Sequence, residues 1–305
     1  MLFFIKRKNF FIHFKEKLLL QNLVHLSTDN NVDIKEKRQQ LMSRGLPKQK
    51  PITGVKNIIL VSSGKGGVGK STTSVNIATF LKHINPNKGI GLLDTDVFGP
   101  SIPLMMNLND QPFINKDNLM EPLVNYGVKC MSMGFLVGKE APVIWRGLMV
   151  MQALEKLIRQ VHWGTLEYLI VDTPPGTGDT LLSLVQNLPI TGVVLVTTPQ
   201  TAALEVTKRG AGLFKKLNVP IIGIVENMNY IKCTACFKNI DLFGKGTTKL
   251  AHELSCTILA SLPLDLGISS STNEGIPIVA SDKESDVSKL YEIIARCIIK
   301  FVENK

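Results

Sequence analysis

Two lysines, a serine and a run of glycines lie close together between residues 64 and 71, a combination that can hold an anion. This stretch reads G-K-G-G-V-G-K-S and fits the pattern G-x-x-x-x-G-K-S. The glycines let backbone N–H groups converge on phosphate oxygens at a helix N-terminus, whose dipole favours an anion. We expect Lys70 to reach the β- and γ-phosphates and the Ser71 hydroxyl to bind Mg²⁺. The alternative is a glycine-rich turn without a ligand.

The segments on either side of this stretch must position it. The apolar run Ile58–Val61 is typical of a buried strand, and helical spacing begins at Thr72 and continues to His83. A strand, a phosphate loop and a helix in this order are the context that the motif requires. The sequence therefore predicts a nucleotide-binding site whose loop contacts come from Gly64, Lys65, Gly66, Gly67, Val68, Gly69, Lys70, Ser71 and Thr72.

A second lysine, Lys65, lies just inside the loop, where an ordinary phosphate loop has no need of one. In this respect the loop resembles the deviant loop of the ParA/MinD-type ATPases, in which the extra lysine reaches across a dimer to the partner's nucleotide. The resemblance implies that Lys65 supplies positive charge in trans, as an arginine finger does. The alternative is a solvated surface lysine.

Acidic residues end two further apolar runs. Residues 89–93 are followed by Asp94-Thr95-Asp96, and residues 169–171 are followed by Asp172. Acids at the carboxyl ends of parallel strands face the crevice where ligands bind. The ParA/MinD resemblance implies that Asp96 positions the attacking water, that Asp94 supports it, and that Asp172 acts through Mg²⁺ or its waters. A surface turn is the alternative for residues 94–96. The expected catalytic residues are Lys65, Lys70, Asp96 and Asp172, and the expected magnesium site is Ser71, Asp94 and Asp172.

Apolar runs alternate with helical patterns along the rest of the chain, which predicts an α/β fold with a mainly parallel sheet wound on both faces by helices. Residues 97–106 are rich in Gly and Pro, so we expect a nucleotide-sensing switch there and no helix. A second switch is expected at the Pro-Pro-Gly turn 174–176. The predicted strands are 58–61, 89–93, 127–133, 169–172, 193–197, 221–225 and 258–262, and the predicted helices are 72–83, 145–159, 204–217 and 285–302.

Asn227 follows the predicted strand 221–225. In the ATPases that the loop resembles, an asparagine at this place reads the adenine edge, which implies the same role for Asn227. An asparagine that merely forms a turn is the alternative.

The positive charge of the chain is concentrated near its N-terminus. The chain has 305 residues and a formal net charge of +10. Residues 1–50 contain 11 Lys/Arg and 4 Asp/Glu, a net of +7, whereas the other 255 residues contain 24 and 21, a net of +3. A body so close to neutral predicts no nucleic-acid-binding face. No apolar run is long enough to span a bilayer, so we also expect no stable membrane insertion.

The first 28 residues mix Phe, Leu and Ile with five Lys/Arg and a single acid, Glu16. This composition is typical of a mitochondrial presequence, and the lack of a continuous apolar core argues against a secretory signal. A disordered basic tail is the alternative. We therefore expect a presequence over residues 1–28, a polar linker over 29–56 and an ATPase and cluster-carrier domain over 57–303.

Cys233 and Cys236 form a C-x-x-C pair in a segment that is predicted to be an exposed loop. Two thiolates hold one edge of a metal or cluster, but four soft ligands are usual. Two copies meeting at a two-fold axis would supply four, and the dimer implied by Lys65 favours such a bridging site. A structural zinc, a redox pair and two free thiols remain alternatives. The other cysteines have apolar neighbours and are expected in the core: Cys130, Cys256 and Cys297.

Several motifs occur together in one order, and with the deviant loop and the cysteine pair they resemble the Mrp-type iron–sulfur cluster carriers over residues 50–302. They are LLDTDVFGPS at 92–101, CMSMGFLV at 130–137, WRGLMVM at 145–151, PPGTGD at 174–179 and ENM at 226–228. The closest resemblance is to the mitochondrial members that are linked to assembly of respiratory complex I. One departure is Thr234, where the family usually has Pro.

The resemblance implies a homodimeric, slow ATPase that binds ATP and Mg²⁺. Such a protein would hold a [4Fe-4S] cluster between two Cys233/Cys236 pairs and pass it to apo iron–sulfur proteins, complex I subunits among them. The mitochondrial matrix is the expected location, with the cytoplasm as the alternative. A metal-free ParA/MinD-like positioning ATPase and an ATP-binding module with structural zinc are the alternative functions.

Overall fold

The computed structural model describes residues 49–136 and 147–305, which form one compact unit from Gln49 onward. The predicted presequence 1–28 lies outside the described residues, as does the predicted linker up to residue 48. The same holds for Trp145 and Arg146, where a helix was expected to open.

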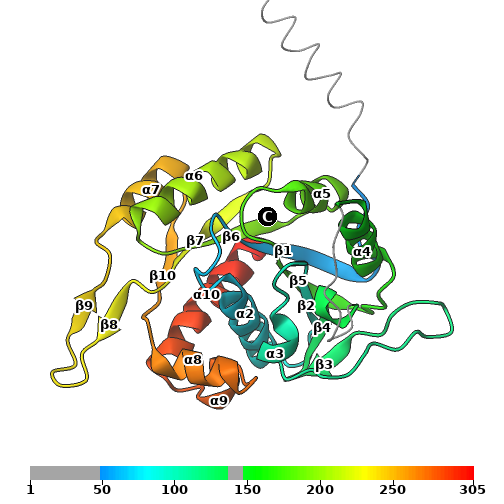
Figure 1. Ribbon diagram of the computed structural model, residues 1–305, viewed down its shortest axis with the longest axis horizontal. Coiled ribbons are helices and arrows are strands. Elements are labelled where there is room, and N and C mark those ends of the chain that lie inside the picture. The colour runs from blue at the N-terminus through cyan, green and yellow to red at the C-terminus, as the bar shows by residue number, and fades with distance from the viewer. Residues whose placement is uncertain (1–48, 137–146) are drawn as a thin grey trace, which may run out of the picture. The chain divides into compact units, whose positions relative to one another are not determined.

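The unit is built on an eight-stranded sheet in the order β10-β7-β6-β1-β5-β2-β4-β3 (Figure 1). Every neighbouring pair is parallel except β3 with β4, so the predicted mainly parallel sheet is confirmed. The strands are β1 (Val55–Ser63), β2 (Ile90–Asp94), β3 (Leu123–Asn125), β4 (Val128–Ser132), β5 (Leu166–Asp172), β6 (Gly192–Thr197), β7 (Ile221–Glu226) and β10 (Ile258–Ser261).

Successive side chains of a strand point to opposite faces of the sheet. Both faces of this sheet are apolar, and helices cover both. On β1, Ile58 and Leu60 pack into one core, whereas Ile59 and Val61 pack into the other. The first core is completed by α4 (Gly147–Arg159), α5 (Asp179–Asn187), α6 (Thr201–Lys216) and α7 (Gly246–Leu254). The second is completed mainly by α2 (Lys70–Ile84) and α10 (Asp286–Glu303), with α3 (Ile102–Met105), α8 (Leu266–Asn273) and α9 (Ile278–Ser281) beside them.

The strand register brings the acidic residues together. β5 lies between β1 and β2, and Asp172 is level with Val61 on one side and with Asp94 on the other. The loop after β1, the acid at the end of β2 and the acid at the end of β5 therefore meet at one edge of the sheet, as expected for the carboxyl ends of parallel strands.

One local prediction was wrong. The segment 97–106 ends in the one-turn helix α3, with Pro103 in its first turn. Proline is tolerated there because the backbone N–H of a first-turn residue has no partner within the helix. The cysteine pair lies in a turn that is mostly exposed, as predicted, but this turn joins two short antiparallel strands that the sequence did not predict, β8 (Tyr230–Lys232) and β9 (Asn239–Asp241). Figure 1 shows this hairpin projecting from the body of the unit.

Candidate functional site: the phosphate loop and the cysteine hairpin

The phosphate loop leads directly from β1 into α2, which begins at Lys70 with Gly69 as its N-cap. Gly67 and Gly69 have φ values of +77° and +83°, a region that residues with a Cβ rarely adopt. No side chain caps the helix, so the backbone N–H groups of its first turn are left for an anion. Thr72 is half-buried in this turn, whereas Gly66 and Gly67 are exposed.

Gly64, the first residue of the motif, contacts helix α6 closely. A Cβ added at Gly64 would lie 2.6 Å from the backbone nitrogen of Thr207. The glycine is therefore required by packing here, in addition to any contact with phosphate.

Lys70 forms a buried ion pair with Asp172, with Nζ 2.7 Å from Oδ2. The Ser71 hydroxyl donates to the same Oδ2 at 2.6 Å, and the Ser74 hydroxyl donates to Oδ1 at 2.6 Å. Three of the four side chains that the sequence assigned to phosphate and magnesium, Lys70, Ser71 and Asp172, thus lie in direct contact. Oxygen donors such as the Ser71 hydroxyl and the Asp172 carboxylate are the ligands that Mg²⁺ prefers.

Asp94 is fully buried behind this group. Its carboxylate accepts hydrogen bonds from the Ser132 hydroxyl at 2.9 Å and from the backbone N–H groups of Asp96 at 3.0 Å and Ile102 at 3.3 Å. Burial, and next the nearby Asp172 carboxylate, raise the pKa of Asp94 to about 7. The side chain therefore ties β2 to β4 and to the start of α3, beside the place where Mg²⁺ is predicted.

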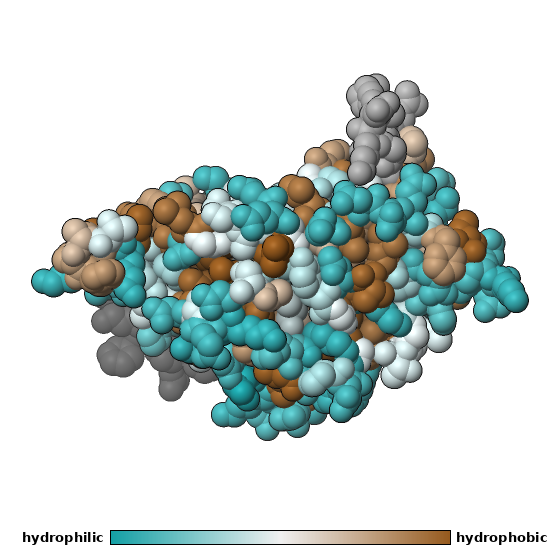
Figure 2. Space-filling view, turned by 90° about the horizontal axis from the view of Figure 1, so that it is seen from below, coloured by the Kyte–Doolittle hydropathy of each residue, from teal (hydrophilic) through white to brown (hydrophobic). Residues whose placement is uncertain are grey.

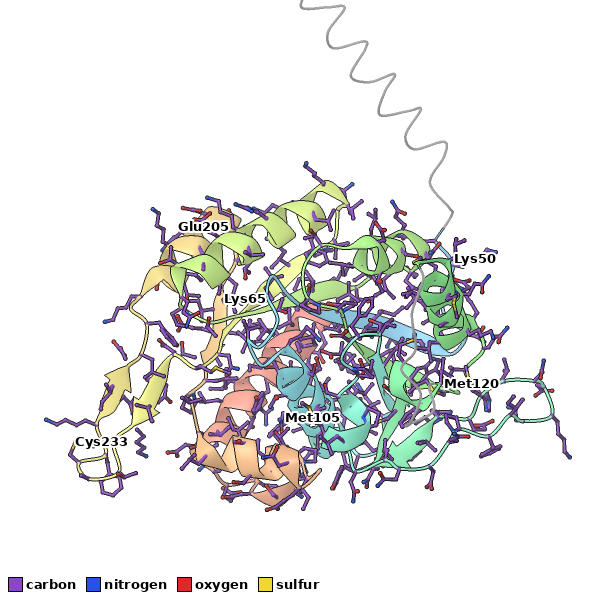
Figure 3. The ribbon with its side chains drawn as sticks, viewed as in Figure 1. Lys50, Lys65, Met105, Met120, Glu205 and Cys233 are labelled. Carbon is purple, nitrogen blue, oxygen red and sulfur yellow. The ribbon has the colours of Figure 1, made fainter. Side chains whose placement is uncertain are left out.

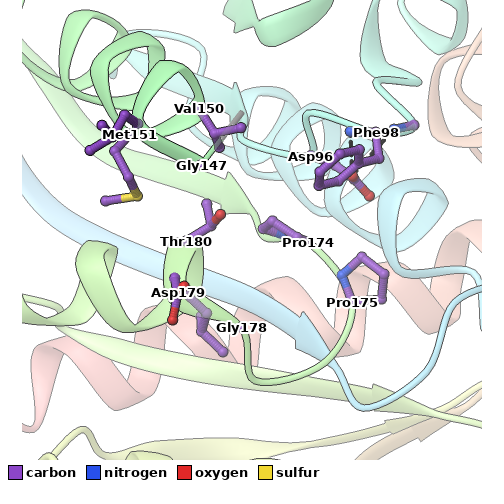
Figure 4. A pocket seen from close by; sticks show the side chains of 13 residues that line it. Asp96, Phe98, Gly147, Val150, Met151, Pro174, Pro175, Gly178, Asp179 and Thr180 are labelled. Atoms are coloured by element: carbon purple, nitrogen blue, oxygen red, sulfur yellow. Dashed lines mark hydrogen bonds between the residues drawn. The ribbon is translucent and has the colours of Figure 1, made fainter. Parts of the chain in front are cut away.

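Asp96 lies at the edge of an apolar cavity of about 850 Å³ between the two predicted switches. Figure 4 shows Asp96 and Phe98 on one side of this cavity and Pro174 and Pro175 on the other. The Asp96 Oδ1 atom accepts from the backbone N–H groups of Phe98 at 3.2 Å and Gly99 at 3.3 Å, which fixes the carboxylate on the loop. Phe98 itself is 80% exposed at the rim of the cavity.

Lys65 lies on the exposed part of the loop (Figure 3). Its backbone carbonyl accepts from the Ser63 hydroxyl at 3.0 Å. Among the described residues its ammonium group forms no ion pair. This exposed position suits the predicted action in trans, which stays a prediction.

Asn227 lies against the phosphate loop and is only 7% exposed. Its side-chain amide donates to the Val68 carbonyl at 2.8 Å, and its backbone N–H donates to the Thr197 carbonyl at 2.7 Å. Because a carbonyl accepts only from the NH₂ end of the amide, the Asn227 Oδ1 atom remains an acceptor. An acceptor at this place suits the amino group of adenine, and the base contact stays a prediction.

The cysteine pair lies away from the phosphate loop, at the tip of the β8–β9 hairpin (Figure 3). The backbone N–H of Cys233 donates to the Lys238 carbonyl at 3.0 Å, and that of Phe237 donates to the Cys233 carbonyl at 2.9 Å. The backbone N–H groups of Cys236 and Ala235 and the Cys236 side chain hydrogen bond to the Cys233 sulfur and lower the pKa of its thiol. Since the thiolate is the form that binds metals, this turn favours metal binding.

Within the part of the chain that the structure describes, no group of three or more His, Cys, Asp or Glu residues could hold a metal ion. Cys233 is half-buried and Cys236 is exposed. The hairpin and the residues just after it carry exposed apolar side chains, and Figure 2 shows hydrophobic surface at the left end of the molecule, where the hairpin lies. They are Ile231, Phe237, Ile240 and Phe243, with Phe237 71% exposed. One chain therefore presents two thiols at the tip of the hairpin, and their role as ligands stays a prediction.

The other cysteines lie elsewhere in the unit. Cys130 is buried in the core, and burial raises the pKa of its thiol. Cys256 and Cys297 are partly buried against the two cores, and burial also raises the pKa of the Cys256 thiol. None of them is near enough to the pair to form a group of three metal ligands with it.

Reasoning from the sequence missed three polar contacts of the site. Ser74 lies one helical turn after Lys70, and this spacing could have placed it near Asp172. Ser132 donates to Asp94, and the Val68 carbonyl accepts from Asn227; in both cases the partners are far apart in the chain, so no local pattern predicts the contact.

A family model described as "ParA: NUBPL iron-transfer P-loop NTPase" matches residues 54–299 of the chain. The chain is 54% identical over 268 residues to "Iron-sulfur cluster transfer protein NUBPL" of Mus musculus, covering 88% of this chain and 84% of the relative. It is 50% identical over 248 residues to "Iron-sulfur protein required for NADH dehydrogenase, mitochondrial" of Arabidopsis thaliana, covering 81% of this chain and 79% of the relative.

Among solved structures, the chain is similar to a nucleotide-binding protein of Archaeoglobus fulgidus in complex with ADP. The TM-score is 0.67 at 31% identity, covering 79% of this chain and 93% of the other. None of the described helices of the present chain is long and apolar enough to cross a membrane.

Proposed function

Since the chain belongs to the NUBPL family of iron-transfer P-loop NTPases, we propose that it carries an iron–sulfur cluster and passes it to apo-proteins in a cycle driven by ATP. One relative is named as an iron–sulfur cluster transfer protein, and another as a mitochondrial protein required for NADH dehydrogenase. These names support subunits of NADH dehydrogenase, respiratory complex I, as recipients and the mitochondrial matrix as the location.

The observation that carries this proposal is the pair of thiols at the tip of the hairpin. Cys233 and Cys236 are accessible, and backbone N–H groups favour the Cys233 thiolate. Because the described part of one chain brings only two thiols together here, a second copy of the chain would complete a set of four. Four thiolates are the usual ligand set of a [4Fe-4S] cluster, so the proposed cargo is a [4Fe-4S] cluster bridging a homodimer.

The phosphate loop is the second part of the proposal. ATP would bind with its β- and γ-phosphates at the first turn of α2, where Lys70 would leave Asp172 and pair with them. Ser71 and Asp172 fit the hard-cation chemistry of Mg²⁺, whose charge would offset the charge on the phosphates. Asp94, held by three donors, keeps a supporting place behind them.

In the proposed hydrolysis, a water held by Asp96 attacks the γ-phosphorus atom. A new P–O bond forms, the bond between the γ-phosphorus and the bridging oxygen breaks, ADP leaves, and a proton of the water passes to solvent. Lys65 of the second copy would supply the remaining positive charge. Because the chain's contribution is positioning and charge stabilisation, we expect the ATPase to be slow.

A transfer assay tests this function. The cluster-loaded protein is mixed with an apo-protein that requires a [4Fe-4S] cluster, and activity of the acceptor is followed with and without ATP. We expect activation of the acceptor by the wild-type protein and none by Cys236→Ala. Failure of the wild-type protein to activate any such acceptor, or tightly bound zinc in place of iron, would favour the structural-zinc alternative.

A further inference from the structure

We propose that Asn227 is a positioning residue that couples occupancy of the phosphate loop to the conformation of the Cys233–Cys236 hairpin. This role is separate from the contact with the base that the sequence suggests. The biological purpose of this coupling rests on the proposed function. The coupling itself links nucleotide binding to the hairpin conformation and needs no cluster.

At the phosphate loop, Asn227 fixes the orientation of one peptide group. Its side-chain amide donates to the Val68 carbonyl at 2.8 Å. The Val68 carbonyl and the Gly69 N–H belong to the same planar trans peptide, so they point in opposite directions. Holding the carbonyl toward Asn227 therefore directs the Gly69 N–H away from Asn227. In this loop, that N–H is one of the donors that can meet a phosphate oxygen.

The contact is too close to absorb a movement of the loop. A Cβ added at Gly69 would overlap the Asn227 amide nitrogen and would lie 3.9 Å from the Met228 Cε atom. Asn227 is buried, and its backbone N–H is held by the Thr197 carbonyl at 2.7 Å. Rotation of the peptide between Val68 and Gly69 must therefore either break the amide hydrogen bond or move Asn227.

On its other side, Asn227 leads directly into the hairpin. Met228 has a φ of +54°, and β8 begins two residues later at Tyr230. The Asn229 N–H donates to the Leu262 carbonyl at 3.0 Å, and the Asn229 carbonyl accepts from Leu242 at 2.9 Å. These bonds clamp both ends of the hairpin at its base, because Asn229 lies four residues before Cys233 and Leu242 six residues after Cys236.

The hairpin has little else to fix its direction. Residues 231–241 are exposed except for Cys233, which is half-buried. Lys232 forms the one described ion pair to the body from this segment, with Asp286 at 3.3 Å, and both side chains are exposed. Surface pairs of this kind contribute little. The direction of the hairpin is therefore set at its base, and residues 227–229 form one side of that base.

Binding of a triphosphate and movement of the hairpin are thus linked through one side chain. Linkage is reciprocal, so a change in the hairpin must alter the affinity for nucleotide by the same factor. Couplings of this kind change affinities by about 5–150-fold.

The test uses the full-length protein without a cluster and measures the alkylation rate of Cys233 and Cys236 by mass spectrometry. The probes are Mg-ATP and inorganic tripolyphosphate, which has no base. In the wild-type protein we expect both probes to change the alkylation rate. In Asn227→Ala, and in Asn227→Asp, whose carboxylate cannot donate to Val68, we expect the ratio of the rates with and without probe to fall toward one.

A matched control is Asn229→Ala, which keeps both backbone hydrogen bonds at the base of the hairpin and should retain the wild-type ratio. Tripolyphosphate affinity should fall in both Asn227 variants, since the Gly69 N–H loses its fixed direction, whereas a residue that only contacts the base would leave it unchanged. Unchanged tripolyphosphate affinity, or a wild-type alkylation ratio in Asn227→Asp, would overturn the coupling. Because no cluster is present, this result is independent of whether the protein carries one.

Discussion

Lys70 and Asp172 are joined by a 2.7 Å ion pair in which the two side chains are 7% and 0% exposed. The lysine comes from the start of α2, and the acid comes from the end of β5. Each partner compensates the buried charge of the other. In the proposed function, phosphates that paired with Lys70 would free the Asp172 carboxylate for Mg²⁺, so the ion pair would keep both charges in place for ATP.

This pairing gives a prediction for Lys70→Ala. We expect the variant to lose ATP binding, because Lys70 carries the charge that faces the β- and γ-phosphates. It should also lose about 3–5 kcal/mol of unfolding free energy, because Asp172 is left as an uncompensated buried charge. Urea unfolding and calorimetric titration with ATP measure the two effects.

The double variant Lys70→Ala/Asp172→Asn is the control, since it removes both charges. It should recover most of the lost stability and none of the ATP binding. If the single and double variants were equally unstable, the ion pair would not be the cause of the instability.

A second prediction concerns Lys65. Its exposed side chain lies at the loop, so Lys65→Ala should bind ATP normally but lose hydrolysis if its target is the nucleotide of a second copy. Mixing Lys65→Ala with Asp96→Asn should restore hydrolysis to about a quarter of the wild-type rate, because half of the dimers would be mixed and each would have one complete site.

The double variant Lys65→Ala/Asp96→Asn, mixed with Lys65→Ala, should restore nothing. Hydrolysis by Lys65→Ala alone at the wild-type rate would refute the action in trans.

A third prediction uses the different environments of the cysteines. Backbone hydrogen bonds lower the pKa of the Cys233 thiol, whereas burial raises that of Cys256. A lower thiol pKa means that the reactive thiolate is present at lower pH. In the apo-protein, the alkylation rate of Cys233 should therefore rise at a pH below the ordinary thiol pKa. The alkylation rate of Cys256 should rise only at a pH above it. Peptide mapping after iodoacetamide treatment measures both, and coincident pH profiles would contradict the geometry of the hairpin.

The fourth prediction concerns residues 1–28, which lie outside the described residues. If they form a presequence, fusing them to a soluble reporter should deliver it to mitochondria. Neutralising Lys6, Arg7 and Lys8 should weaken delivery, because import favours a positively charged amphipathic segment. A reporter that stays in the cytosol would return the segment to the disordered-tail interpretation.

The sheet was predictable because its strands are apolar runs buried on both faces and separated by helical patterns. β1 and β5 are such runs, and β5 ends at Asp172, which the sequence predicts as a site residue. The hairpin was not predictable in the same way. β8 and β9 have three residues each and are mostly exposed, so they lack the apolar alternation that identifies a strand.

In the candidate site, too, some features were predictable from the sequence and others were not. Local motifs placed Lys70, Ser71 and Asp172 together, because strand ends in a parallel sheet meet at one edge. The hydrogen bond between Asn227 and Val68 joins residues 159 positions apart and leaves no local signal. The family resemblance, by contrast, rested on several motifs in one order and is confirmed.

The most direct test of the account is the iron and sulfide content of the anaerobically reconstituted protein, measured together with its mass in solution. Four-cysteine ligation across two chains predicts about four iron and four sulfide per dimer. Cys233→Ala and Cys236→Ala should each abolish the cluster, whereas the matched control Cys256→Ala should keep it. A stable cluster on a monomer, or one that survives loss of both Cys233 and Cys236, would contradict the bridging site.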